Sequence, residues 1–329
     1  MIETLELRNF KSHLTTFLEF GRLTALVGPN GAGKTSVLEA INQVAERTFA
    51  PQAVDPRKDG PLRRGTTMME IKLGPTGNAP EPGKLIGCRL LKLSAEKLAE
   101  PSYFQELQPA VDGKGRFLAT VLATLKNSDE KQFLKIVQLT QEVVPSLQTV
   151  GIRRAKVPIS ETRFISVDGK EIPWDEKREM IGEELVFTIA GVPDIPASAV
   201  SEGTLLALGL ITILSAPDRP NLILLDDIEQ GLHPKAQRCL VDVLKRIQDL
   251  PGNEELQIVF TTHSPYVVDE MDPKDVWVLA MDEAGVTVAK RLSDHPEVQE
   301  DEGVLSTGEL WSALGEDWVL DRDGSATDG

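Results

Sequence analysis

The segment from Gly28 to Thr35, which reads Gly-Pro-Asn-Gly-Ala-Gly-Lys-Thr, carries the residues best suited to chemistry. It fits the pattern G-x-x-x-x-G-K-[ST], in which glycines let the backbone curl so that successive N–H groups point inward toward phosphate oxygens. In that pattern Lys34 reaches the β- and γ-phosphates and the Thr35 hydroxyl ligates Mg²⁺. The alternative is a helix-start turn that binds nothing. The sequence predicts a nucleotide-binding loop, to which we assign Asn30, Gly31, Gly33, Lys34, Thr35 and Ser36.

Two carboxylates end an apolar segment further along the chain, Leu222 to Asp227. An acid at the end of a buried strand beside a phosphate loop can hold Mg²⁺ directly or through water, and we assign this role to Asp226. The next acid, Asp227, can orient or deprotonate the attacking water. Acids at strand ends are also common at the ligand edge of any α/β sheet, so the prediction depends on the pairing with the phosphate loop.

A histidine stands directly after another apolar strand, in the sequence Thr261-Thr262-His263-Ser264. At this edge of a sheet a neutral imidazole can donate to the γ-phosphate or hold the attacking water. The ordinary alternative for His263 is a local hydrogen bond at a strand end. Its expected place near the phosphate loop favours the first interpretation.

The residues Ser201-Glu202-Gly203-Thr204 precede an apolar segment and have the features of a helix start. Ser201 can act as the N-cap of that helix, which requires no ligand. A serine and a glycine at an exposed helix N-terminus also form an anion site. These residues alone leave both interpretations open.

The elements that must position these residues follow from the spacing of the apolar side chains. Leu23 to Val27 is a buried strand that leads into the phosphate loop, and a helix from Thr35 to about Glu46 follows it. Ser94 to about Leu147 has helical spacing, and Thr149 to Ile189 is rich in strands. Further strands are expected at Ile2–Leu7, Thr16–Phe20, Met68–Leu73, Lys84–Leu93, Asn221–Asp226, Ile258–Thr262 and Val276–Ala280. Further helices are expected at Ser201–Leu214 and Pro234–Asp249. The strand pattern breaks at Arg8–Ser12, and Phe49–Thr66 is expected to be an exposed loop.

The composition is that of an ordinary globular protein, with 41% hydrophobic and 26% charged residues among 329. A net charge of −16 argues against a generally DNA-binding surface. The basic clusters at Arg57–Arg64 and Arg153–Lys156 can form solvated loops, a patch near the nucleotide or a nucleic-acid track. No apolar segment approaches the length of a membrane span and the N-terminus has no signal-peptide pattern, so we expect a cytoplasmic protein without membrane contact. Cys88 and Cys239 are expected to pack as small hydrophobic residues.

Along the chain these motifs are a phosphate loop, a helical insertion, a Ser-x-Gly helix start, an apolar strand with acids and a strand with a histidine. This order is similar to that of ATP-binding-cassette (ABC) ATPases, and within them it resembles the RecF/SMC/OLD branch. Arg8 to Ser12 resembles the Asn-Phe-Lys-Ser segment of that branch, Val27 to Ile41 its phosphate loop, and Glu229 to Pro234 the E-x-G-L-H-P stretch of OLD-like members. The resemblance implies an α/β fold of the ABC-ATPase P-loop type, with a mixed sheet, flanking helices and a helical and strand-containing insertion lobe.

The resemblance also implies the ligands, ATP and Mg²⁺. Lys34 and Thr35 would bind phosphate and Mg²⁺, and Asp226 would be the Walker B acid. Because the Asn-Phe-Lys-Ser segment matches as well, Arg8 and Lys11 join the expected nucleotide-binding residues.

For catalysis, the resemblance gives Asp227 the place of the usual glutamate and His263 that of the switch histidine. Asp227 is one methylene shorter than glutamate, which can slow hydrolysis or shift the positioning of water toward Glu229. The expected catalytic residues are therefore Asp227, Glu229, His263 and Lys34.

The signature motif of the family falls at Ser201 and Gly203, where this sequence reads Ser-Glu-Gly-Thr rather than Ser-Gly-Gly-Gln. In ABC ATPases the signature of one subunit contacts the ATP bound to the other. Because the chain has one signature and one phosphate loop, we expect a homodimer that sandwiches two ATP molecules. Candidates for the Q-loop glutamine are Gln105 and Gln108.

The motifs divide the chain into four expected segments. They are an N-terminal ATPase lobe with Walker A (1–93), a helical and strand insertion lobe (94–200), a C-terminal ATPase lobe with the signature, Walker B and switch histidine (201–282) and a C-terminal tail segment (283–329). In the tail, the apolar stripe from Leu305 to Leu320 either docks a partner or folds back on the chain's own core.

The expected biological role follows from comparison with the larger members of the branch. The insertion has no long heptad array like the SMC arms, and the residues after Ala280 are too few for the nuclease domain of OLD nucleases. We therefore expect an ATPase that gates a separately encoded effector protein, as in bacterial anti-phage defence systems such as Septu. The alternatives are a RecF-like clamp for DNA repair or maintenance and a scaffold that holds ATP with little turnover.

Overall fold

The computed structural model describes residues 1–49, 70–74, 87–104, 109–167, 170–217, 219–300 and 304–321. The chain folds into two compact units. The first comprises residues 1–91 and 218–329, and the second comprises residues 92–217. The chain thus leaves the first unit and returns to it, as an inserted lobe requires.

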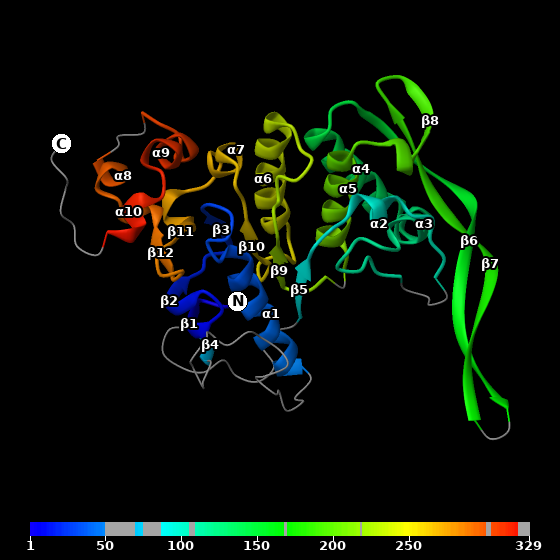
Figure 1. Cartoon of the computed structure of the whole chain (residues 1–329). Helices are drawn as coiled ribbons and strands as arrows, with labels where there is room; N and C mark the ends of the chain where they lie inside the picture. The colour runs from blue at the N-terminus through cyan, green and yellow to red at the C-terminus, as the bar shows by residue number, and fades with distance from the viewer. Residues whose placement is uncertain are drawn as a thin grey trace. The chain divides into compact units, whose positions relative to one another are not determined.

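A six-stranded sheet forms the centre of the first unit (Figure 1). Its strands are, in spatial order, β12 (Thr287–Arg291), β11 (Val276–Met281), β3 (Leu23–Val27), β10 (Gln257–Thr261), β9 (Leu222–Leu225) and β5 (Cys88–Leu91). Neighbours pair in parallel except β12, which is antiparallel to β11. Parallel strands covered on both faces need apolar side chains throughout, and every residue of β3, β9 and β10 is buried. The carboxyl ends of these three strands meet at one edge, where Gly28, Asp226 and Thr262 follow them.

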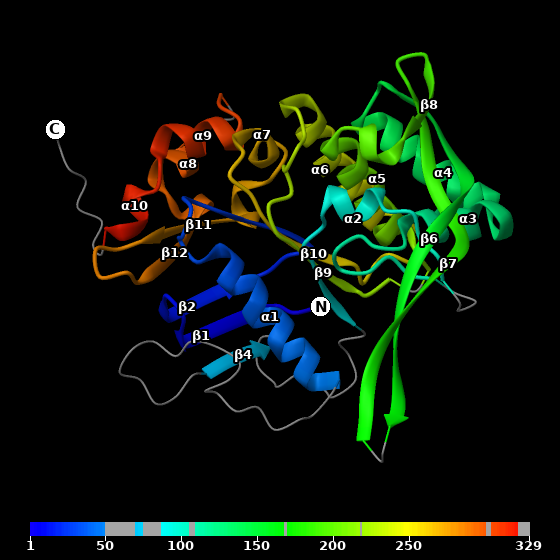
Figure 2. The ribbon, with the colours of Figure 1, turned by 45° about the vertical axis from the view of Figure 1, so that its right-hand side comes forward.

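A three-stranded antiparallel sheet shares the core with helix α1 (Lys34–Phe49). Its order is β2 (His13–Glu19), β1 (Thr4–Phe10) and β4 (Glu70–Gly74), and α1 runs beside it (Figure 2). Val37, Leu38 and Ile41 lie on one face of α1 and pack in a cluster that also contains Leu7 of β1 and Leu224 of β9. The first turns of α1 are therefore fixed against both sheets, which gives the preceding phosphate loop a rigid support.

Strand β1 continues past the point where the apolar pattern breaks. Its ladder with β2 includes Arg8 and Phe10, and the next two residues form the turn. The predicted break at Arg8–Ser12 is therefore wrong for its first part, because pairing across the hairpin continues where the local alternation stops. As a result β2 begins at His13 rather than at Thr16.

The remaining helices of the first unit lie between and after its later strands. They are α6 (Pro234–Gln248), α7 (Pro265–Val268), α8 (Pro296–Glu300), α9 (Thr307–Leu314) and α10 (Asp317–Leu320). Helix α9 packs on α7 and α10 packs on β11, and this buries Leu310, Trp311 and Val319. Of the two interpretations of the apolar stripe in this region, the structure favours folding back on the chain's own core.

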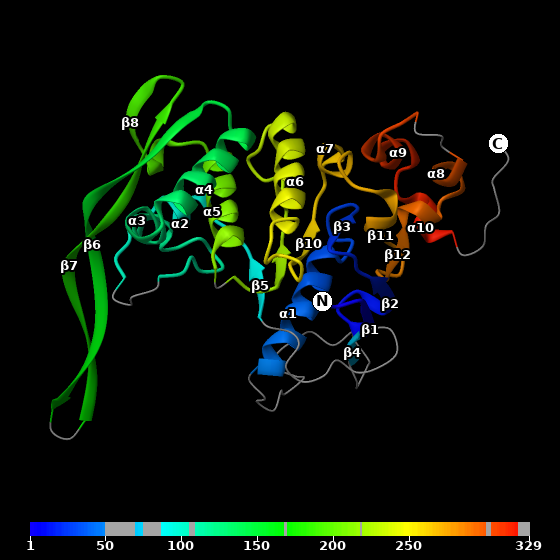
Figure 3. The same cartoon turned by 180° about the vertical axis from the view of Figure 1, so that it is seen from behind.

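The second unit combines a helical bundle with a long hairpin. Its elements are α2 (Ala95–Ala99), α3 (Leu118–Ser128), α4 (Glu130–Val143), β6 (Leu147–Val167), β7 (Lys170–Ile189), β8 (Val192–Pro196) and α5 (Glu202–Ser215). Strands β6 and β7 form one long twisted ribbon, and β8 pairs with β7 at its C-terminal end (Figure 3). Helix α5 packs on α4 and α2 and is buried along most of its length.

The observed architecture confirms the predicted fold class, an α/β fold with a mixed sheet, flanking helices and an inserted helical and strand lobe. The packing units differ from the expected segments in two places. Helix α5, expected in the C-terminal ATPase lobe, packs within the second unit, and β12, expected in the tail, is a strand of the central sheet. The loop expected at Phe49–Thr66 lies outside the described residues except at its first position. None of the described helices combines the length and the apolar character needed to cross a membrane.

Candidate functional site

The residues after β3 form a tight loop that leads into α1, as the phosphate-loop pattern predicts. Gly28, Gly31 and Gly33 have positive φ angles of 136°, 85° and 101°, in a region of backbone space open chiefly to glycine. At Gly28 a Cβ atom would lie 2.0 Å from the carbonyl oxygen of Leu279, so contact alone excludes a larger residue. Apart from its neighbours in the chain, no atom of the described residues lies within 4 Å of such a Cβ at Gly31, which leaves the backbone there accessible to a ligand.

Lys34 folds back over the loop. Its Nζ donates hydrogen bonds of 2.9 Å to the carbonyl oxygens of Gly28 and Pro29. Burial lowers the pKa of Lys34, and nearby carboxylates, Asp227 first among them, act in the opposite direction. An ammonium group that has already lost most of its water is a strong hydrogen-bond donor to a phosphate oxygen.

Thr35 and Asp226, the two residues assigned to Mg²⁺, are in contact. Thr35 Oγ1 donates to Asp226 Oδ1 at 2.9 Å, and Thr261 Oγ1 donates to the same oxygen at 2.9 Å. Proteins usually hold Mg²⁺ through one or two such oxygens while phosphates and waters complete the shell. The pair fits this ion, because a hydroxyl and a carboxylate oxygen from positions 191 residues apart converge at the loop.

Asp227 and His263 face each other, with 3.8 Å between Asp227 Oδ1 and His263 Nε2. Asp227 has a φ of 52°, a left-handed conformation that aspartate tolerates better than most residues, and its side chain is 54% exposed. Glu229 instead contacts the backbone, since its Oε1 accepts a hydrogen bond of 2.6 Å from His263 N. Its Oε2 is buried and has no hydrogen-bond partner among the described residues. Asp227 is therefore accessible to a ligand, and Glu229 supports the segment that carries His263.

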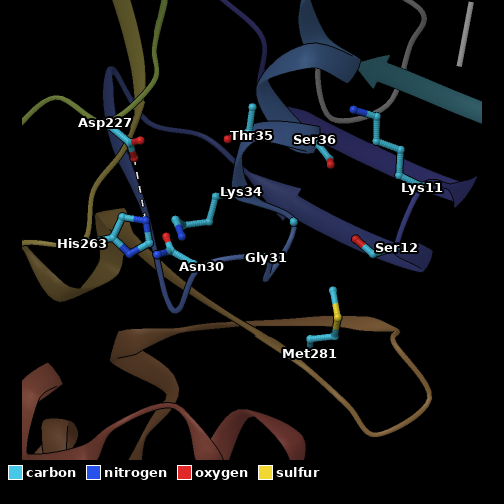
Figure 4. A pocket seen from close by; sticks show the side chains of 11 residues that line it. Lys11, Ser12, Asn30, Gly31, Lys34, Thr35, Ser36, Asp227, His263 and Met281 are labelled. Carbon is cyan, nitrogen blue, oxygen red and sulfur yellow. Dashed lines mark ion pairs between the residues drawn. The ribbon is translucent and has the colours of Figure 1, made fainter. Parts of the chain in front are cut away.

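Lys34, Thr35, Asp227 and His263 line a cavity of about 320 Å³ in the first unit, whereas Asp226 and Glu229 are not among its lining residues. Figure 4 shows Asp227 and His263 at one end and Lys11 at the other, with Lys34 between them. The cavity is lined by Lys11, Ser12, Asn30, Gly31, Gly33, Lys34, Thr35, Ser36, Asp227, His263 and Met281. Every phosphate-loop residue assigned from the sequence thus faces one space that can hold a ligand.

Two lining residues, Ser12 and Met281, are missing from the set assigned from the sequence. Ser12 could have been found from its place in the Asn-Phe-Lys-Ser segment. Met281 ends β11, where no local motif marks it.

The two cations expected from the first hairpin lie in different surroundings. Lys11 lines the cavity and forms an ion pair with Glu39 of α1. Arg8 pairs with Glu6 at 2.5 Å and is not one of the lining residues. A contact between Arg8 and nucleotide therefore stays a prediction.

The signature residues belong to the second unit. Ser201 is the N-cap of α5, where its side chain accepts a hydrogen bond from Thr204 N, and Gly203 is buried in the first turn. The helix start exists as expected, and its role toward nucleotide stays a prediction. The Q-loop candidates Gln105 and Gln108 lie outside the described residues.

Two protein families match the chain. The family described as "AAA ATPase domain" matches residues 1–185, which is more than half of the chain. A second family, described as "AAA domain, putative AbiEii toxin, Type IV TA system", matches residues 118–269. Together these matches include the phosphate loop, Asp226 and His263.

Curated relatives resemble parts of the chain. OLD nuclease from Thermus scotoductus is 25% identical over 337 residues, covering 82% of this chain and 60% of the nuclease. The DNA double-strand break repair Rad50 ATPase of Methanopyrus kandleri is 53% identical over 51 residues, covering 15% of this chain and 6% of that protein. The chain therefore spans less than two thirds of either relative.

Solved structures share the fold. The SMC head bound to the C-winged helix domain of ScpA has a TM-score of 0.52 at 15% identity, covering 91% of this chain and 99% of that chain. An SMC head domain with an extended coiled coil, bound to the C-terminal domain of ScpA derived from Pyrococcus furiosus, has a TM-score of 0.50 at 13% identity, covering 91% and 98%. These likenesses concern the fold alone. Together with the family matches and the order of the motifs, they lead to one conclusion: the chain belongs to the AAA ATPase domain family and is a RecF/SMC/OLD-like ABC-type ATPase.

Proposed function

We propose that the chain binds and hydrolyses Mg²⁺-ATP as a dimer whose opening and closing control a partner effector. The observation that carries the ATPase part is the hydrogen bond of 2.9 Å between Thr35 Oγ1 and Asp226 Oδ1. It brings a hydroxyl and a carboxylate suited to Mg²⁺ to the loop on which Lys34 lines the cavity. The N-terminus of α1 adds the positive end of its dipole at the same point.

The residues in and beside the cavity have separate tasks in this proposal. Lys34 and the loop amides bind the phosphates. Thr35 and Asp226 hold Mg²⁺, which when bound neutralises the charge that develops on the phosphate oxygens. Asp227 orients the attacking water or accepts its proton, because its carboxylate is exposed in the cavity. His263 detects the γ-phosphate, since an N–H group of its imidazole can donate to it from this position.

The geometry supports Asp227 over Glu229 as the residue that acts on water. Glu229 does not line the cavity, and one of its oxygens is engaged by His263 N. Its proposed role is to hold the switch segment in place.

The dimer part of the proposal concerns the second unit. Ser201 begins α5, a helix of 14 residues, and Gly203 brings no side chain to this N-terminus. Such a helix end attracts anions. In the closed dimer, Ser201 and Gly203 of one copy would contact the ATP that is bound to Lys34 of the other. The γ-phosphate then supplies a contact that exists only in the closed state, which is how a ligand shifts such an equilibrium.

The proposed partner is a separate effector protein of an anti-phage defence system. The match to a family whose description names a toxin and a Type IV TA system supports this. The similarity to a protein named as an OLD nuclease supports it as well. Closure on ATP would engage the effector, and hydrolysis would release it.

A RecF-like DNA clamp is the second candidate, favoured by the similarity to a protein named for DNA double-strand break repair. The basic cluster on β6 gives it little support. Arg153 pairs with Glu184 at 2.5 Å, and Lys156 pairs with Glu179 at 2.9 Å, in both cases across the hairpin. A cation that already has a carboxylate partner must give up that partner to bind a DNA phosphate.

The proposal is tested by measuring phosphate release and particle mass with and without Mg²⁺-ATP. We expect phosphate release from the wild type and a doubling of mass in ATP. Neither should occur with Asp226→Asn. A wild type that releases no phosphate and does not change mass contradicts both parts of the proposal. Nucleotide retention without phosphate release, unchanged by Asp227→Asn, would indicate the scaffold role.

A second experiment separates the effector from the clamp. A neighbour-encoded protein that co-purifies with the chain, and whose association changes with ATP, would support the effector. Salt-sensitive, ATP-dependent DNA binding that falls in Arg153→Ala and Arg154→Ala would instead support the clamp.

A further inference from the structure

A buried polar cluster packs against the phosphate loop outside the cavity. His13, the first residue of β2, is fully buried, and Thr287, the first residue of β12, is nearly so. His13 Nε2 lies 3.2 Å from the carbonyl oxygen of Gly33, and Thr287 Oγ1 lies 2.9 Å from that of Ala32. Two consecutive carbonyls of the loop thus contact side chains that have no task in the proposed reaction.

The partners of His13 assign the proton on its ring. A carbonyl oxygen can only accept, so His13 carries its proton on Nε2 and donates it to Gly33 O. Its Nδ1 is then an acceptor, and the Thr16 hydroxyl, 3.0 Å away, donates to it. Burial lowers the pKa of His13 from 6.5 to about 4, so the ring is neutral at physiological pH and keeps this arrangement.

The same reasoning assigns donor and acceptor among the hydroxyl groups around Thr287. Because Ala32 O can only accept, the Thr287 hydroxyl donates to it, and Ser12 Oγ, 2.7 Å away, donates to Thr287 Oγ1. The backbone strengthens this contact, since Thr287 N donates to Ser12 O at 2.9 Å. Ser12 also lines the cavity, so the cluster extends from the interior to the edge of the ligand site.

We propose that His13 and Thr287 are positioning residues that set the direction of the amide groups in the phosphate loop. In a trans peptide the C=O and the following N–H point in opposite directions, and the structure contains no cis peptide in the residues that it describes. Holding the carbonyls of Ala32 and Gly33 toward the cluster therefore turns the N–H groups of Gly33 and Lys34 away from it. The inference rests on the proposed ATP site, because it is phosphate that these amides would bind.

Gly33 is the position at which this arrangement requires glycine. A Cβ atom there would lie 2.6 Å from Thr287 Oγ1 and 2.9 Å from His13 Nε2, and it would push both side chains off the loop. The two hydrogen bonds join residues that are 20 and 255 positions apart in the chain. The glycine therefore allows the turn and also allows side chains from β2 and β12 to approach the loop closely.

Matched substitutions separate positioning from a purely structural role. His13→Gln ends in an N–H donor about as far from the backbone as Nε2, whereas His13→Asn ends at the level of Nδ1 and cannot reach Gly33 O. Thr287→Ser keeps the hydroxyl, whereas Thr287→Val replaces it with a methyl group of similar size. In each pair only one variant can still hold its carbonyl.

The experiment measures ATP affinity by titration of the full chain and, without nucleotide, the amide hydrogen exchange of residues 29–36. We expect His13→Asn and Thr287→Val each to weaken ATP binding about tenfold, the loss of one buried hydrogen bond, and to speed exchange in the loop. His13→Gln and Thr287→Ser should stay close to the wild type in both measurements. Cooperative thermal unfolding checks that each variant is folded.

The proposal is wrong if His13→Asn and Thr287→Val bind ATP like the wild type, or if the conservative variants are impaired as much as they are. If His13→Asn does not fold, the comparison of Thr287→Val with Thr287→Ser tests the proposal. If the wild type itself binds no ATP, the proposed function fails. Hydrogen exchange, which needs no nucleotide, then still decides whether His13 and Thr287 hold the loop.

Discussion

The phosphate loop has two sides. The side that faces the cavity carries Lys34 and is accompanied there by Asp227 and His263, whereas the buried side contacts His13 and Thr287. The Asp227 and His263 side chains remain 54% and 34% exposed, and Lys34 bonds to backbone oxygens that a phosphate can replace. On the buried side both ring nitrogens of His13 and the hydroxyl of Thr287 have partners within the protein. The cavity side therefore has hydrogen-bond donors and acceptors available for a ligand, whereas those of His13 and Thr287 on the buried side are engaged within the protein.

This difference indicates that one set of residues around the loop is available to bind a ligand, while another set holds the loop in place. Gly28, Gly31 and Gly33 let the loop adopt its positive φ angles, but glycine also leaves the backbone free to adopt other conformations. The buried side supplies the constraint, since its hydrogen bonds are shielded from competing water. Substitutions on the cavity side should therefore change chemistry, and substitutions on the buried side should change stability and affinity.

The largest effect is expected on the cavity side, from Lys34→Ala. It removes the cation that would bind the β- and γ-phosphates, so ATP hydrolysis should fall at least about a thousandfold and ATP-driven dimer closure should be lost. Phosphate release and particle mass in ATP measure the two effects. Lys274→Ala, at an exposed position of the same unit, is the matched control. Closure of Lys34→Ala on ATP would contradict the sandwich model of the dimer.

The next effect distinguishes Asp227 from Glu229. Asp227→Asn keeps the shape of the side chain but removes the base, so hydrolysis of bound ATP should fall about a hundredfold while ATP affinity is retained. Glu229→Gln keeps an oxygen that can accept from His263 N and should lose less than about tenfold. Single-turnover phosphate release measures both variants. Equal losses would assign the positioning of water to Glu229 as well.

Most residues that line the cavity could be predicted from the sequence because they belong to local motifs. The glycine pattern identifies the loop, and apolar strands that end in Asp226 and in Thr262-His263 must bring these residues to one edge of a parallel sheet. The buried side could not be predicted, because His13 and Thr287 reach the loop from 20 and 255 positions away. Helix α5 illustrates the same limit. Its apolar sequence indicates burial, but not that the neighbours are α2 and α4.

The buried side yields a prediction about pH. Burial lowers the pKa of His13 from 6.5 to about 4, the hydrogen bond to Gly33 opposes this shift, and the charge of Lys11 adds to it. The unfolded chain therefore takes up this proton before the folded chain does. The contribution to stability is complete above pH 6.5 and is lost as the pH falls toward 4, by about 3 kcal/mol in all.

Urea unfolding at neutral pH and near pH 4.5 measures this contribution. Carboxylates also titrate in this range, so the wild type is compared with His13→Gln. In that variant the free energy of unfolding should change by about 2 to 3 kcal/mol less between the two pH values. The same pH dependence in both proteins would mean that His13 is not a neutral, buried base.

The smallest effect concerns the support of a second loop, the one that carries His263. Asp269, directly after α7, accepts hydrogen bonds from Ser306 Oγ at 2.5 Å and Gly308 N at 3.2 Å, and pairs with Arg238 at 2.5 Å. Asp269→Asn keeps an oxygen for the start of α9 but loses the ion pair with a half-exposed arginine. The free energy of unfolding should fall by about 1 kcal/mol, as measured by urea unfolding, with hydrolysis unchanged.

Asp269→Ala, which removes both contacts, provides the matched comparison and should lower the free energy of unfolding by about 2 to 3 kcal/mol. Both variants should still hydrolyse ATP like the wild type once folded, because Asp269 supports the loop from outside the cavity. A slower reaction without loss of stability would mean that the α7–α9 contact sets the position of His263 for chemistry. The division between a reactive side and a supporting side would then hold for the phosphate loop but not for the loop that carries His263.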